Sequence, residues 1–190
     1  CYDGATPFSV MNLKGIEENV VLVDSVSKRY SMCGARIGAL ITKNQEVLDA
    51  VMKFAQARLS PPTYAQVAAE AALQTPQSYF DQVQAEYVER RNIMVNGLNE
   101  IEGVRCPMPR GAFYCVAEFP VDDTEKFCQW LLEDFEHKGK TVMMAPLSGF
   151  YATPGLGKKE ARIAYVLEKD HLRDALVCLE EALKVYPGRA

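Results

Sequence analysis

The first half of the chain alternates short apolar runs with helical patterns. Residues 20–23 are uninterrupted valine and leucine, which predicts a strand over 20–24 that is buried in a parallel sheet. A second strand is expected over 36–42. Apolar residues at a spacing near 3.6 predict a helix over 45–57, and an alanine-rich segment predicts another helix over 63–74.

A long amphipathic helix follows these elements. Thr75 is a suitable N-cap, Pro76 suits the first helical position, and a continuous apolar face predicts a helix over about 76–101. We expect this helix to bridge two domains, residues 1–90 and residues 91–190.

The last part of the chain has an α+β pattern. Asp122 and Asp123 can cap a helix that ends near Gly139. Short apolar segments predict three strands, over 112–117, 141–144 and 161–166. Leucines at helical spacing predict a final helix with its buried face formed by Leu172, Leu176, Leu179 and Leu183.

Composition and charge narrow the function classes. The chain has 190 residues, 48% hydrophobic and 24% charged, which is ordinary for a soluble globular protein. The net charge of −4, without a basic stripe, argues against a nucleic acid partner. The sequence contains no apolar run of about eighteen residues and no signal-peptide pattern, so we expect no membrane association and a cytoplasmic location.

Cysteine and histidine usage gives no support for a metal site. The six cysteines show no C-x-x-C pairing, and most lie in apolar patterns, which is typical of reduced core thiols. The two histidines, His137 and His171, are far apart in the sequence. No metal is therefore expected.

Lys28 is the first candidate for chemistry. It follows the predicted strand 20–24, at the end of a strand where α/β sheets usually bind ligands. Hydroxyl-bearing Ser25 and the cation Arg36 lie close to it in the sequence, a combination that suits a Schiff-base amine beside a phosphate pocket. A solvated surface lysine is the alternative interpretation of Lys28 taken alone.

Arg162 is the second candidate, because it lies inside an apolar strand. An arginine in such a position is costly unless its charge is paired, so it forms either a structural ion pair or a binding site for an anion. The segment from Pro109 to Tyr114 ends in two aromatic residues, Phe113 and Tyr114. From their spacing alone, both rings would be assigned to the core.

These segments together resemble the class I/II aminotransferases, which are fold-type I pyridoxal-phosphate enzymes. The resemblance rests on Ser-x-x-Lys over residues 25–28, on Gly-x-Arg-x-Gly over 34–38, and on Pro-x-Gly-Ala-Phe-Tyr over 109–114. It implies an α/β fold in which part of the large cofactor domain, residues 1–90, is followed by the small α+β domain, residues 91–190. Such chains are about twice as long, so this sequence resembles their second half.

The resemblance also implies a role for each candidate residue. Lys28 would hold pyridoxal 5′-phosphate as a Schiff base and later move the substrate proton. Ser25 and Arg36 would bind the cofactor phosphate, since an arginine fork suits two phosphate oxygens. Arg162 would bind the substrate carboxylate, with Phe113 and Tyr114 lining the substrate pocket. Residues 145–151 match a loop that closes over substrate, but they depart from the usual Pro-Gly order, and we assign them no catalytic role.

The implied reaction is transamination between an amino acid, with aspartate first among the candidates, and a 2-oxo acid, in a full-length homodimer. Three family features would lie upstream of Cys1: the glycine-rich phosphate loop, the stacking aromatic residue, and the aspartate that pairs with the pyridine nitrogen. We therefore expect the fragment alone to be inactive. The alternatives are a pyridoxal-phosphate β-lyase and an aminotransferase-like ligand-sensing domain of a transcription regulator.

Overall fold

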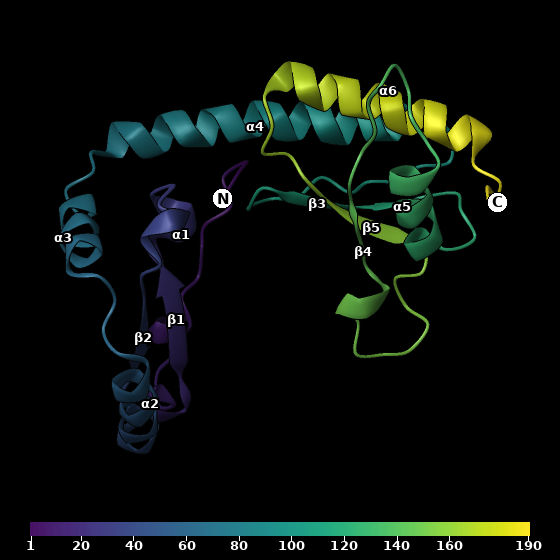
Figure 1. Cartoon of the computed structure of the whole chain (residues 1–190). Helices are drawn as coiled ribbons and strands as arrows, with labels where there is room; N and C mark the ends of the chain where they lie inside the picture. Colours follow the sequence, from purple (N-terminus) through teal and green to yellow (C-terminus); the bar gives the residue numbers. More distant parts are fainter. The chain divides into compact units, whose positions relative to one another are not determined.

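The computed structural model describes residues 1–190, which form two compact units (Figure 1). One unit is Thr6–Tyr79. The other combines the N-terminal residues Cys1–Ala5 with Phe80–Ala190. None of the helices has both the length and the apolar composition that crossing a membrane requires.

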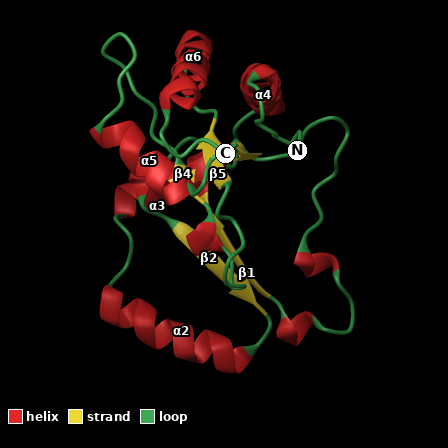
Figure 2. Ribbon diagram, turned by 90° about the vertical axis from the view of Figure 1, so that its right-hand side faces the viewer, coloured by secondary structure: helices red, strands yellow, loops and turns green.

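The unit Thr6–Tyr79 is built around two paired strands (Figure 2). They are β1 (Val21–Ser25) and β2 (Gly38–Thr42), which run antiparallel with Ser25 opposite Gly38. The helices of this unit are α1 (Val26–Arg29), α2 (Gln45–Arg58) and α3 (Thr63–Ala72). The predicted helices over 45–57 and 63–74 are confirmed, and the side chain of Asn44 caps α2 by accepting from the backbone N–H of Val47 at 3.0 Å.

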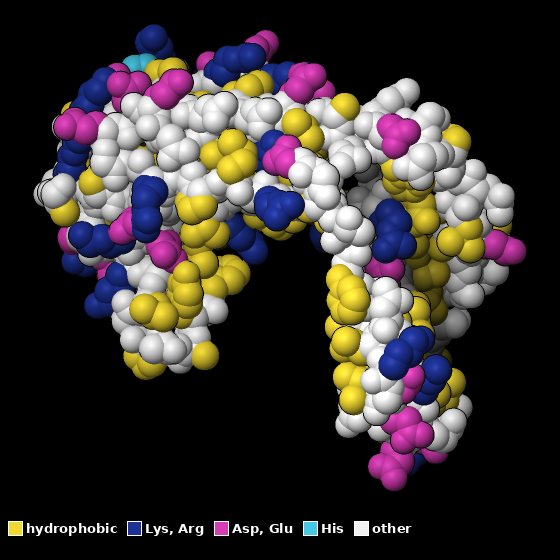
Figure 3. Space-filling model, turned by 180° about the vertical axis from the view of Figure 1, so that it is seen from behind, with side chains coloured by type: hydrophobic (Ala, Val, Ile, Leu, Met, Phe, Trp, Pro, Cys, Tyr) yellow, Lys and Arg dark blue, Asp and Glu magenta, His cyan; other side chains and the backbone are white.

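The prediction of a buried parallel strand over 20–24 is wrong in its pairing and in its burial. The connection over 26–37 contains no helix long enough to cross back over a sheet, so β2 returns antiparallel to β1. Val23 is 74% exposed, and only Val20 and Ala65 are buried among the apolar residues of this unit. Hydrophobic side chains are accordingly exposed over the unit (Figure 3). The apolar run thus predicted the strand correctly, but it predicted neither the direction of its partner strand nor its exposure to solvent.

The other unit contains a three-stranded antiparallel sheet in the order β3-β5-β4. Its strands are β3 (Tyr114–Glu118), β4 (Ala145–Pro146) and β5 (Glu160–Ala164). The predicted strands over 112–117 and 161–166 are confirmed within two residues. The strand over 141–144 is misplaced, because the pairing with β5 lies at Ala145 and Pro146.

Two long helices pack together in this unit. They are α4 (Gln77–Glu100), which confirms the predicted helix over 76–101, and α6 (Lys169–Val185). The helices run side by side in Figures 1 and 2. Their approach is close at Gly97, where an added Cβ would lie only 2.4 Å from a methyl group of Leu176. The core between helices and sheet includes Met94, Val95, Leu98, Phe119, Phe127, Leu131, Tyr165, Leu172, Leu179 and Leu183.

Helix α5 (Thr124–Glu133) covers part of the same core. Asp123 caps it as predicted, because its carboxylate accepts from the backbone N–H of Glu125 at 2.8 Å. The helix ends well before Gly139, contrary to the prediction. Lys138 and Gly139 have φ values of 54° and 74°, and they form a tight turn between two bridged residues that is incompatible with helix.

Candidate active site

Lys28 lies on α1, directly after β1. Ser25, the last residue of β1, caps this short helix by accepting from the backbone N–H of Ser27 at 3.0 Å, and its hydroxyl lies 2.7 Å from that of Ser27. Lys28 is exposed and makes no hydrogen bond or ion pair with the chain. Its amine is therefore available to a ligand, unlike the side chain of neighbouring Arg29, whose guanidinium pairs with Asp24 at 2.9 Å.

Arg36 approaches the same region from the start of β2. Its φ of 53° lies in the left-handed region, and its Nη1 donates to the carbonyl of Cys33 at 2.9 Å. At Gly38 a Cβ would come within 2.7 Å of the carbonyl oxygen of Asp24, so the close β1–β2 pairing there requires glycine. The backbone of this segment is thus tightly constrained around the Arg36 side chain.

An open hollow of about 380 Å³ brings the predicted phosphate ligands together. Ser25, Ser27, Arg36 and Gly38 line it, whereas Lys28 follows Ser27 on α1 and is not part of the lining. Two hydroxyl groups and a guanidinium are the donors that a phosphate group needs. Ser25, Ser27 and Arg36 therefore fit the phosphate end of pyridoxal phosphate, and Lys28, the residue after Ser27, carries the unpaired amine that its aldehyde end requires. We call Ser25, Lys28 and Arg36 the lysine group.

Arg162 lies in the central strand of the other unit, opposite Val116 of β3 and Ala145 of β4. Its guanidinium carbon lies 4.4 Å from the ring centroid of Tyr114 and 4.9 Å from that of Phe150. The guanidinium of Arg162 forms no ion pair or hydrogen bond with the chain, so the structural ion pair considered from the sequence is not found. Aromatic faces hold the cation, and its N–H groups have no acceptor within the protein.

The two predicted pocket aromatics have different surroundings. Tyr114 contacts Arg162 and is half-buried. Phe113 packs between two other aromatic rings. Its ring centroid lies 5.9 Å from that of Tyr87 and 4.6 Å from that of Tyr114. We call Tyr114, Phe150 and Arg162 the arginine group.

Phe150 is the residue that sequence reasoning missed. It ends a short 3₁₀ turn, Ser148–Phe150, in the loop that the sequence matched to the family without a role. The sequence did contain one indication of this role, because Phe150 is an aromatic residue in the segment 145–151, which matches a family loop that closes over substrate. The lysine group lies in the unit Thr6–Tyr79, and the arginine group lies in the other unit.

A comparison with known families identifies the chain. The family described as aminotransferase class I and II matches residues 2–177. The chain belongs to this family. Its members depend on pyridoxal 5′-phosphate, in agreement with the chemistry of the lysine group. No three His, Cys, Asp or Glu side chains of the structure are grouped so that they could hold a metal ion.

Individual relatives agree with the family assignment. An aspartate aminotransferase from Rhizobium meliloti is 31% identical over 182 residues, covering 90% of this chain and 42% of the relative. The crystal structure of an aspartate aminotransferase from Rhizobium meliloti matches with a TM-score of 0.80 at 29% identity, covering 95% of this chain and 46% of that one.

An aromatic aminotransferase from Pyrococcus horikoshii OT3 matches with a TM-score of 0.83 at 28% identity, covering 96% of this chain and 48% of that one. The chain therefore spans less than half the length of these relatives. The predicted fold, that of fold-type I pyridoxal-phosphate enzymes, is confirmed by these structural matches.

Proposed function

We propose that the full-length protein is a pyridoxal-phosphate-dependent aminotransferase that moves an amino group from an amino acid to a 2-oxo acid. The observation that carries this proposal is a hollow lined by Ser25, Ser27 and Arg36, with Lys28, whose amine is unpaired, as the next residue after Ser27 on α1. Aspartate is the first candidate substrate, because relatives that cover most of this chain are named aspartate aminotransferases. An aromatic amino acid is the alternative, because other relatives are named for that substrate.

The lysine group performs two tasks in this proposal. Ser25 and Arg36 would bind the phosphate of the cofactor, and the Nζ atom of Lys28 would bind its aldehyde carbon. With substrate bound, the amine of Lys28 would accept the proton from the substrate Cα and then donate it again as a general acid. The bound cofactor supplies an electron sink for the negative charge that proton removal leaves.

The arginine group orients the substrate. Arg162 binds the α-carboxylate with two parallel N–H donors, because its guanidinium has no carboxylate of the protein to compete. The ring of Tyr114 fixes the plane of the guanidinium, and this fixes the direction of the substrate Cα–H bond. Orientation of this kind contributes to rate by proximity rather than by chemistry.

Residues 1–190 alone are proposed to be insufficient for turnover, since they span less than half of each relative. The homodimer stays a prediction of the family resemblance, and the cytoplasmic location stays a prediction from the sequence pattern.

Borohydride reduction of the full-length protein loaded with pyridoxal phosphate tests the proposal directly. We expect peptide mass mapping to find the reduced adduct on Lys28 and not on Lys43, an exposed lysine of the same unit. The Lys28→Ala variant should lose the adduct and the transamination of aspartate with 2-oxoglutarate, whereas Lys43→Ala should keep both. An adduct on another lysine, or turnover that survives Lys28→Ala, would contradict the assignment. Release of pyruvate, ammonia and sulfide from cysteine, with no 2-oxo acid added, would indicate a β-lyase instead.

A further inference from the structure

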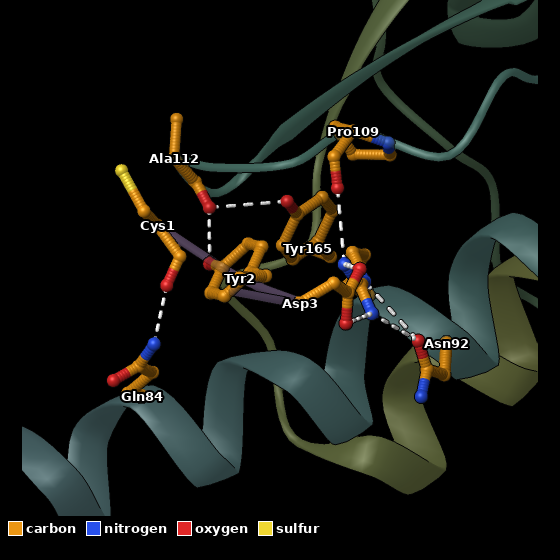
Figure 4. A network of polar contacts seen from close by, with 9 residues as sticks. Cys1, Tyr2, Asp3, Gln84, Asn92, Pro109, Ala112 and Tyr165 are labelled. Atoms are coloured by element: carbon orange, nitrogen blue, oxygen red, sulfur yellow. Dashed lines mark hydrogen bonds and ion pairs between the residues drawn. The ribbon is translucent and has the colours of Figure 1, made fainter. Parts of the chain in front are cut away.

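Arg91 is the only charged side chain that the fold buries, with 3% of its surface exposed. It lies on α4, and its guanidinium carbon lies 4.9 Å from the ring centroid of Tyr2. A buried guanidinium is costly unless all its donors are satisfied. The structure satisfies them through a network that joins residues distant in sequence (Figure 4).

The donors of Arg91 hold two segments together. Nη1 and Nη2 bind the two carboxylate oxygens of Asp3 at 2.6 Å and 3.2 Å, a bidentate arrangement. Nη1 also donates to the carbonyl of Pro109 at 3.1 Å, while Nε and Nη2 donate to the Asn92 side chain. The pKa of Asp3 is lowered by this hydrogen-bonded cation. Arg91 therefore fixes the N-terminal residues and the start of the 109–113 turn at once.

The rest of the turn is fastened by two tyrosines. The backbone N–H of Tyr2 donates to the carbonyl of Arg110 at 2.9 Å, and the Tyr2 hydroxyl donates to the carbonyl of Ala112. The Tyr165 hydroxyl donates to the same Ala112 carbonyl at 3.1 Å. The backbone N–H of Tyr165 donates to the carbonyl of Phe113 at 3.1 Å. Four of the five carbonyl groups of residues 109–113 thus have a donor from outside the turn.

The fastened turn leads directly into the arginine group. Ala112 has a φ of 61°, a left-handed conformation that a residue with a Cβ rarely adopts, so the turn needs outside support. Tyr114 begins β3 immediately after the turn and contacts the guanidinium of Arg162. Tyr165 lies three residues after Arg162, just past the end of β5. The network therefore holds the two strands that carry Tyr114 and Arg162.

We propose that Arg91 is a positioning residue of the substrate site: by binding Asp3 and Pro109, it holds the turn that places Tyr114 against Arg162. The inference rests on the proposed function of the arginine group as a carboxylate clamp. Arg91 itself touches no substrate in this proposal. A lysine at the same position would keep the charge but lose the bidentate fork, so the turn would be held less firmly.

The Arg91→Lys variant of the full-length protein tests this inference, with Arg173→Lys as the matched control. Arg173 also pairs with an aspartate, Asp170, at 2.8 Å, but on the exposed surface of α6. We expect Arg91→Lys to raise the KM for aspartate about tenfold, equivalent to about 1.4 kcal/mol. The Kd of succinate, a dicarboxylate without the amino group, should rise by a similar factor. Pyridoxal phosphate loading should be unchanged, and kcat should fall by less than about threefold. Arg173→Lys should change none of these.

Failure of the proposed function and failure of the positioning role of Arg91 give different results. If the wild type neither transaminates nor forms the Lys28 adduct, the proposed function fails, and the positioning role fails with it. If the wild type is active and Arg91→Lys leaves the KM for aspartate and the Kd of succinate unchanged, only the positioning role is overturned. Unchanged values overturn it even if the variant melts at a lower temperature.

A smaller substitution, Tyr165→Phe, tests the same inference if the Arg91→Lys variant does not fold. Tyr165→Phe removes a single hydroxyl, and Tyr2 still donates to the Ala112 carbonyl. We expect the KM for aspartate and the Kd of succinate to rise about threefold, with cofactor loading intact. Unchanged values in a folded Tyr165→Phe protein would overturn the role of the network in positioning Tyr114 and Arg162.

Discussion

Arg162 has its guanidinium 4.4 Å from the centroid of the Tyr114 ring, and the two residues come from adjacent strands, β5 and β3. The contact places a cation in the middle of an antiparallel sheet without a carboxylate partner. Aromatic faces attract a cation but leave its N–H edges free for an anion. The pair is thus better suited to bind a ligand than to stabilise the sheet.

Substitution of Arg162 should therefore affect activity far more than stability. We expect Arg162→Gln in the full-length protein to lower kcat/KM for aspartate by about a hundredfold, equivalent to about 2.7 kcal/mol, because a charge-assisted carboxylate contact is lost. The free energy of unfolding should change by less than about 1 kcal/mol, because only the ring contacts are lost. Steady-state kinetics and urea unfolding measure the two quantities.

Arg105 is the matched control for this prediction. It is exposed, and it pairs with Glu118 at 2.8 Å on the surface of the same unit. Arg105→Gln should change neither quantity appreciably, because exposed ion pairs contribute little. If Arg162→Gln were as active as Arg105→Gln, the carboxylate clamp would be wrong.

Arg36 should discriminate pyridoxal phosphate from pyridoxal. Arg36→Gly keeps the left-handed backbone, since glycine adopts a φ of 53° without strain, but removes the phosphate-binding fork. We expect the Kd of the full-length variant for pyridoxal phosphate to rise about 10–100-fold, and its Kd for pyridoxal, which has no phosphate, to stay the same. Absorbance titration with each compound gives both constants.

A parallel loss of affinity for both compounds would indicate that Arg36 supports the fold rather than the phosphate. Arg29→Gly is the comparison variant, because this arginine is one residue from Lys28 but pairs with Asp24 instead of lining the hollow. Its phosphate discrimination should equal that of the wild type.

The sequence predicted elements well where the pattern was long. Helix α4 has a sustained apolar face, and its predicted bounds differ from the observed ones by one residue at each end. β1 was located correctly, but its antiparallel pairing and its exposed Val23 were not predicted. Hydrophobic residues in a strand indicate that its surface is apolar. They predict neither the direction of the neighbouring strand nor which residues cover that surface.

For the candidate site too, the sequence indicated some residues and missed others. Lys28 and Arg162 could be singled out as candidates because each combines an unusual local setting with a motif, and their roles stay predictions. Phe150 could not, because its contact with Arg162 depends on how a loop folds back over the sheet. The network around Arg91 was also missed, because Asp3 and Pro109 are far from α4 in the sequence and no local pattern links them.

The cap of α5 provides a stability prediction within one unit. Asp123→Ala should lower the free energy of unfolding by about 1 kcal/mol, because the first turn of the helix loses its side-chain acceptor. Asp134→Ala, at the other end of α5, should cost nothing, since a negative charge is unfavourable near a helix C-terminus. Urea denaturation of both variants compares the two ends. Equal losses at Asp123 and Asp134 would contradict the capping role.

The Arg91–Asp3 pair predicts a specific acid sensitivity. The hydrogen-bonded guanidinium lowers the pKa of Asp3 below its ordinary value of 3.8. A carboxyl group with a lowered pKa in the folded state contributes stability that is fully present above pH 3.8 and is lost as the pH falls through the lowered pKa.

Asp3→Asn removes this contribution, so the variant should be less stable at neutral pH, where Arg91 has lost its ionised partner. Its unfolding free energy should then depend less steeply on pH than that of the wild type below about pH 4. Asp170→Asn, an exposed aspartate that also pairs with an arginine, should follow the wild-type slope. Urea unfolding at a series of acidic pH values measures these slopes, and an Asp3→Asn slope equal to that of Asp170→Asn would show that the Arg91–Asp3 pair does not control acid stability.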